Sequence, residues 1–242
     1  MSGMEASSSA ALAHLEAAAA TFSATLTADL ALPVPGCPGW DVRALASHLG
    51  GVHRWACSAL IQPRPDEQSD DGPEPGVDLR SWFDEGARDL VATLHSTDPG
   101  TPCWTFGPPP RTAAFWCRRQ AHETSMHAWD AEQATSGTPT PFPLDLALDG
   151  VKEVVTMFVP RQIRLGRLAP LPQAVELRPA DAPAAASWRL GPADRDPDAL
   201  VSAPAATLLL LLWRRLPLAG AGVRVTGDVD AVRTVLAAPL TP

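Results

Sequence analysis

Residues 118–130 read RRQAHETSMHAWD and place two histidines and a glutamate within six residues of a predicted helix. His122 and Glu123 could begin an H-E-x-x-H motif, in which two histidines one helical turn apart bind zinc. The next histidine, His127, follows His122 by five positions, which sets the two side chains about 140° apart around a helix. They cannot share a metal, so the spacing excludes this motif.

Glu123 and His127 are instead four positions apart, about 40° around the helix, and lie one above the other on the same face. If this segment holds a metal, this pair holds it, and the other ligands come from elsewhere. His48 is the candidate, because it lies at the edge of the apolar face that Leu45 and Val52 mark on an earlier predicted helix. Two histidines and a glutamate are the ligand count of catalytic zinc sites that keep one position open.

The sequence also allows other interpretations of these residues. A histidine at the edge of an apolar face is more often a core residue, and a Glu/His pair at i,i+4 is more often a solvated pair. His53 and His122 could replace members of the set, although His53 is about 140° from His48. His14 and His95 have no suitable neighbours in the sequence and are expected on the surface or in packing.

The first part of the chain is predicted to be helical. Apolar residues at helical spacing predict helices at about 5–30, 41–61, 78–96 and 112–136. Asp41 is placed to cap the second of these, and a polar, proline-rich loop is predicted at 62–77. Small residues form one stripe on the last helix, which suits close packing. The pattern therefore predicts a four-helix bundle.

The turn-rich segment SGTPTPFP at 136–143 predicts a domain boundary, so the expected domains are 1–138 and 139–242. The second domain is expected to contain helices at about 144–159, 204–216 and 228–236, with strands at 174–179, 187–190 and 223–227. The predicted fold class is a four-helix bundle followed by a small α+β domain.

Composition limits the classes of partner. The net charge of −8 argues against an electrostatic grip on nucleic acid or on an anionic membrane. The 4 cysteines lie without a C-x-x-C pair and are expected to be reduced thiols. With no long apolar run and no signal-peptide pattern at the start, a cytoplasmic monomer or homodimer with a small-molecule partner is expected.

Several stretches together resemble the mycothiol-dependent maleylpyruvate isomerase family. They are PGWDVRALASHLGGVHRWA at 38–56, RRQAHETSMHAWDAE at 118–132, TLLLLLWRRLP at 207–217 and VRVTGDVDAV at 223–232. The resemblance implies a DinB-like four-helix bundle that binds a divalent metal, usually zinc, and a C-terminal domain of sterol-carrier-like α+β topology.

Carried over by motif, the metal ligands are His48, Glu123 and His127, the same set that the spacing favours. Asp130 would support a ligand or face the substrate, and its alternative is a solvated helix carboxylate. Arg215 and Arg224 are the candidates for a functional arginine in the second domain, although each alone reads as an ordinary surface arginine.

The implied function is a metal enzyme that uses mycothiol as a thiol cosubstrate on a small electrophilic molecule, as an isomerase or an S-transferase. A free thiol has a pKa near 8.5, and zinc coordination removes its proton. One alternative keeps the metal and uses it to activate water for hydrolysis. Another is a non-catalytic protein whose second domain holds an apolar ligand.

Overall fold

A computed structural model describes residues 2–63, 71–183, 185–220 and 222–242. The chain divides into two compact units, Met1–Thr140 and Pro141–Pro242. The first consists of helices, and the second combines helices with a small sheet, so the predicted fold class is confirmed. Part of the loop expected at 62–77 lies outside the described residues.

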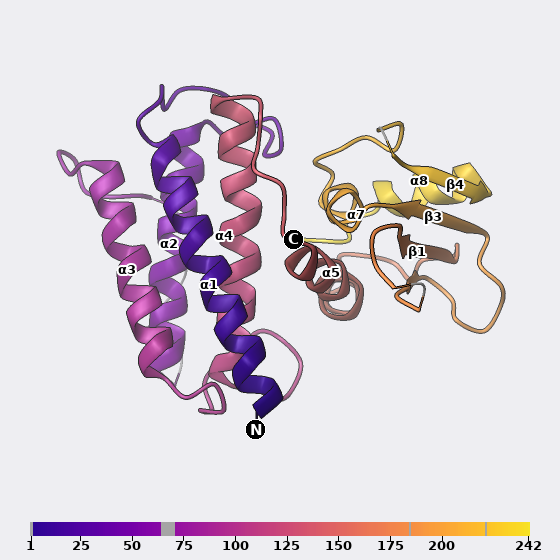
Figure 1. The fold of residues 1–242 in the computed structure, drawn as a ribbon, viewed down its shortest axis with the longest axis horizontal. Helices are drawn as coiled ribbons and strands as arrows, with labels where there is room; N and C mark the ends of the chain where they lie inside the picture. Colours follow the sequence, from indigo (N-terminus) through magenta and orange to yellow (C-terminus); the bar gives the residue numbers. More distant parts are fainter. Residues whose placement is uncertain (1, 64–70, 184, 221) are drawn as a thin grey trace. The chain divides into compact units, whose positions relative to one another are not determined.

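The first unit is a bundle of long helices that run side by side (Figure 1). They are α1 (Ser2–Thr25), α2 (Val42–Ile61), α3 (Leu79–Ser96) and α4 (Ala113–Thr135). Helix α1 packs along α4, and α2 packs against both α3 and α4. The small-residue stripe of α4 is buried from Cys117 to Ala131, which lets α1 and α2 approach it closely.

The ends of these helices follow from local hydrogen bonding. Asp41 caps α2 as predicted, since its carboxylate accepts a hydrogen bond from the backbone N–H of Ala44 at 2.7 Å. The expectation that the first helix continues to residue 30 was wrong, because α1 ends at Thr25. The hydroxyls of Thr25 and Thr27 bond to the carbonyls of Phe22 and Ala24 and compete with further helical pairing.

Aromatic rings close one end of the bundle. Trp116 is fully buried at 0 % exposure and donates from its indole nitrogen to the carbonyl of Trp104 at 2.8 Å. Trp55, Phe106 and Phe115 surround it, with ring centroids 5.2–5.9 Å from that of Trp116. Edge-to-face contacts of this kind stabilise a core beyond the area they bury. The cluster anchors α2 and α4 against each other.

The second unit contains a four-stranded sheet with the order β2-β1-β3-β4. The strands are β1 (Val175–Pro179), β2 (Trp188–Leu190), β3 (Ala199–Ala203) and β4 (Arg224–Gly227). β1 and β3 are parallel, and the outer strands pair antiparallel to them. β3 was not predicted, because alanine has a low strand propensity and its run is short.

The helices of the second unit are α5 (Leu144–Glu153), α6 (Val159–Arg164), α7 (Ala205–Leu212) and α8 (Val229–Ala237). The helix expected at 144–159 extends to Arg164, because a π-helical turn, η1 (Val154–Phe158), joins α5 directly to α6. That turn lies just before Pro160, which has no N–H to donate in a regular helix. All the leucines of α7 are buried, as expected for a core helix.

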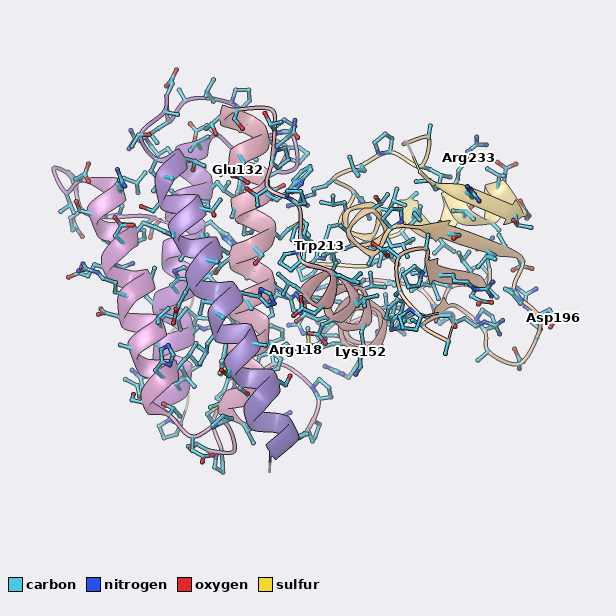
Figure 2. The ribbon with its side chains drawn as sticks, in the orientation of Figure 1. Arg118, Glu132, Lys152, Asp196, Trp213 and Arg233 are labelled. Atoms are coloured by element: carbon cyan, nitrogen blue, oxygen red, sulfur yellow. The ribbon has the colours of Figure 1, made fainter. Side chains whose placement is uncertain are left out.

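The linker after α4 is tied back to that helix. The carboxylate of Glu132 accepts hydrogen bonds from the backbone N–H and the hydroxyl of Thr140, at 2.7 and 2.9 Å. Figure 2 shows Glu132 near the C-terminal end of α4. Within the described part of the chain, no helix is both long and apolar enough to cross a membrane.

Candidate metal centre

His48 on α2 and the pair Glu123 and His127 on α4 converge on one point. Oε1 of Glu123 lies 3.4 Å from Nε2 of His48 and 3.3 Å from Nε2 of His127. One potential ligand atom from each of the three residues lies within 4.8 Å of the others. The two imidazole rings are 5.3 Å apart and nearly perpendicular, at 83°. The structure therefore brings together all three residues that the sequence singled out as ligands.

These separations fit a small divalent cation. Tetrahedral zinc with bonds of about 2.0–2.2 Å keeps its ligand atoms about 3.3–3.6 Å apart. Both distances from Glu123 Oε1 to the imidazole nitrogens match that spacing. The side chains of His48 and Glu123 are 16 % and 18 % exposed, so the ligands are partly reachable from solvent. Two imidazoles and a carboxylate suit zinc and leave a coordination position for another molecule.

The two oxygens of Glu123 have different partners. Oε1 faces the two imidazoles, whereas Oε2 accepts a hydrogen bond from the guanidinium of Arg119 one turn earlier on α4. Burial alone would raise the pKa of Glu123, but Arg119 and the hydrogen bonds from His127 and His48 hold this pKa well below its usual value. Glu123 is therefore ionised at neutral pH, as a metal ligand must be.

His127 is held from its other ring nitrogen. Nδ1 of His127 lies 3.1 Å from Oδ2 of Asp130, whose side chain is completely buried. Burial would lower the pKa of His127, but hydrogen bonds with Asp130, Cys37 and Glu123 raise this pKa well above its usual value. A carboxylate behind a ligating histidine fixes the ring orientation and increases its basicity.

The loop between α1 and α2 borders this site. The thiol of Cys37 lies 3.6 Å from Oδ2 of Asp130, and the ring of Trp40 lies 4.8 Å from that of His48. Cys37, His127 and Asp130 form a second set of close potential ligand atoms. Asp130 is 0 % exposed and pairs with the inner ring nitrogen of His127, so this set fits a role that supports His127.

The remaining histidines lie elsewhere. His53 is fully buried, with Nε2 2.9 Å from the hydroxyl of Thr124 and its ring against Phe83. His95 is exposed, and its Nε2 lies 2.6 Å from a carboxylate oxygen of Glu16, a pairing that the sequence did not predict. His122 is buried and belongs to neither of the close ligand sets found among the described residues.

Both candidate arginines belong to the second unit. Arg215 is half-buried after α7, and its guanidinium donates to the carbonyl of Trp213 at 2.9 Å. Arg224 is exposed at the start of the edge strand β4.

Sequence reasoning missed three residues at the site. Arg119 could have been found, because it lies four positions before Glu123 and so shares its helix face. The contacts of Cys37 and Trp40 could not, because they depend on the path of a loop distant in sequence from α4.

Fold and site together define a class: a helical bundle with a candidate divalent-metal centre on two facing helices, followed by a small α+β unit. Family models give the particular family. The model described as the mycothiol maleylpyruvate isomerase N-terminal domain matches residues 12–132, and the MDMPI C-terminal domain matches residues 145–234. The chain belongs to the mycothiol-dependent maleylpyruvate isomerase family.

Solved structures agree on the fold. The crystal structure of the mycothiol-dependent maleylpyruvate isomerase aligns with a TM-score of 0.62 and 16 % identity, over 92 % of this chain and 94 % of that one. A histidine mutant of that isomerase aligns over the same shares, with a TM-score of 0.64 and 15 % identity. No curated protein sequence matches the chain.

Proposed function

We propose that this chain is a metal-dependent enzyme that uses mycothiol to act on a small electrophilic molecule, as an isomerase or an S-transferase. The observation that carries the proposal is the convergence of His48, Glu123 and His127 at distances suited to zinc. Family membership supports the thiol cosubstrate. We further propose that the enzyme acts in the cytoplasm.

A divalent cation held by these three residues would lower the pKa of a bound thiol, so that the thiolate is available at neutral pH. Three of the protein's 4 cysteines are poor substitutes. Burial raises the pKa of Cys117 to about 11, and it also raises the pKa of Cys57 and of Cys103. An external thiol is therefore a more suitable nucleophile than Cys57, Cys103 or Cys117.

The proposed reaction begins when the thiolate sulfur forms a bond to an electrophilic carbon. For a cis-enone, the C=C electron pair moves to the carbonyl oxygen, rotation follows, and loss of the thiolate gives the trans isomer. If the adduct is instead protonated and released, the product is an S-conjugate. Both outcomes need the same first step, so one site can support either.

The side chains divide the remaining work. Asp130 holds His127 in one ring orientation and is a positioning residue. The half-buried ring of Trp40 packs against the ring of His48, with the centroids 4.8 Å apart, and helps to fix its position. Arg215 and Arg224 stay the candidates for a functional arginine in the second unit.

The test is an assay of purified protein with and without mycothiol, after loading with zinc and after removal of zinc by a chelator. We expect turnover of a cis-enone, or formation of an S-conjugate from an alkylating electrophile, only when both zinc and thiol are present. Turnover that needs zinc but ignores the thiol would instead support a metal-dependent hydrolase. Activity that ignores zinc would refute the proposal.

A further inference from the structure

The carboxylate of Glu123 lies between two side chains of its own helix. Arg119, Glu123 and His127 follow one another at intervals of four residues, so they form a single ridge along α4. Each interval is about 6 Å along the helix axis. The guanidinium of Arg119 therefore approaches Glu123 from one side, and the imidazole of His127 from the other.

This arrangement separates the functions of the two carboxylate oxygens. Oε1 lies within 3.4 Å of the ligand nitrogens of His48 and His127. Oε2 is engaged by Nη2 of Arg119, whose side chain is only 4 % exposed. A charge-assisted bond to a buried guanidinium is among the stronger hydrogen bonds, and turning Oε2 away would leave a buried charge without this partner.

We infer that Arg119 is a positioning residue that restricts Glu123 to one-oxygen coordination and so keeps a coordination position open for the thiol. The inference rests on the proposed function, because it assumes a divalent cation at His48, Glu123 and His127. A carboxylate can bind a metal through one oxygen or through both. With Oε2 held by Arg119, only Oε1 is available to the cation.

Cobalt(II) in place of zinc gives a readout that does not depend on turnover. The visible absorption of cobalt(II) weakens as its coordination number rises above four. Titration with 2-mercaptoethanol then reports thiol binding through the thiolate-to-cobalt absorption. The variants are Arg119→Met, which removes the donors, and Arg119→Lys, which keeps the charge without the planar fork.

Arg54→Met is the matched control. Arg54 lies on α2, donates to the carbonyl of Trp82 at 2.8 Å and stacks 4.0 Å above the Trp82 ring. Its loss should destabilise the bundle without changing either oxygen of Glu123. We expect this control to match the wild type in its cobalt spectrum and in its thiol affinity.

In Arg119→Met we expect bound cobalt with weakened visible absorption and a thiol dissociation constant raised at least about tenfold, the scale typical of residues that support metal ligands. Arg119→Lys should lie between Arg119→Met and wild type. A wild-type spectrum with wild-type thiol affinity in Arg119→Met would overturn the inference. So would loss of cobalt binding by this variant while it remains folded.

If Arg119→Met does not fold, the test rests on Arg119→Lys. A cobalt spectrum and a thiol affinity in Arg119→Lys that both equal those of the wild type would overturn the inference. Failure of the proposed function has a different signature. If wild-type protein binds neither zinc nor cobalt, the proposed function fails. If the wild type binds cobalt and thiol and the Arg119 variants behave as wild type, only the role of Arg119 fails.

Discussion

Nδ1 of His127 lies 3.1 Å from the buried carboxylate oxygen Oδ2 of Asp130, while Nε2 of the same ring lies 3.3 Å from Glu123. The imidazole of His127 thus connects the candidate metal centre to the carboxylate of Asp130, which is fully buried. The three-residue spacing from His127 to Asp130 on α4 makes this contact possible. Asp130 therefore fixes the orientation of the His127 ring through Nδ1, and Nε2 remains available to bind a metal.

Asp130→Asn should weaken zinc binding. The amide keeps the shape of the carboxylate but loses its charge, so it should hold His127 less firmly. We expect the zinc dissociation constant to rise about 10- to 100-fold, as for other carboxylates behind ligating histidines. Competition with a chromophoric chelator measures this. Asp84→Asn, a surface change next to Arg80, is the control, and equal zinc affinity in both variants would contradict the role of Asp130.

Gly50→Ala should destabilise the bundle. A Cβ atom at residue 50 would overlap the indole ring of Trp82, which itself stacks against Arg54. Overpacking of this kind costs about 1–3 kcal/mol of unfolding free energy, measurable by urea denaturation. In a Trp82→Ala background the cost of Gly50→Ala should largely disappear. An equal cost in both backgrounds would show that the ring is not the cause.

His53 should make stability depend on pH. Burial lowers the pKa of His53 to about 3, partly offset by Glu123, whereas unfolding restores a pKa near 6.5. The unfolded state therefore binds more protons between these values. The contribution of His53 is complete above pH 6.5 and is lost as the pH falls toward 3. From pH 7.5 to 5 the loss is about 2 kcal/mol.

The comparison for this prediction is His53→Gln, which keeps a side-chain group able to bond to Thr124 but does not titrate. Urea denaturation of both proteins across the same pH range isolates the contribution of His53 from those of other groups. The stability of the wild type should fall more steeply below pH 6.5. Parallel pH curves would show that His53 does not keep a depressed pKa in the folded protein.

Replacement of Cys57, Cys103 and Cys117 together by alanine should leave thiol-dependent turnover within about threefold of the wild type. Their raised pKa values make them poor nucleophiles at neutral pH, and none belongs to the ligand sets found among the described residues. A steady-state assay with varied mycothiol measures this. If turnover disappears in a folded triple variant, a protein thiol takes part in the reaction.

Helical periodicity could predict much of the fold and the core of the site. Glu123 and His127 are related by one helical turn, a local relationship that spacing alone describes. Periodicity alone could not place His48 in the ligand set, because only the packing of α2 against α4 brings it to Glu123 and His127. Cys37 and Trp40 lie in an irregular loop, so no periodic pattern indicated that they border Asp130 and His48.

In the second unit too, local sequence patterns predicted only part of the structure. The leucines of α7 form a continuous apolar run, and this predicted a buried helix correctly. Strand β3 is held by its neighbours β1 and β4, and its alanines gave little local signal for a strand. The continuation of the helix past Pro160 depends on a π-helical turn that no simple propensity describes.

The proposed metal site requires that His48, Glu123 and His127 together hold one divalent cation. Elemental analysis of purified protein tests it most directly, with His127→Ala as the variant and His95→Ala, a surface change, as the control. We expect about one zinc per chain in the wild type and in His95→Ala, and none in His127→Ala. Absence of metal from the wild type after incubation with zinc, or full retention in folded His127→Ala, would contradict it.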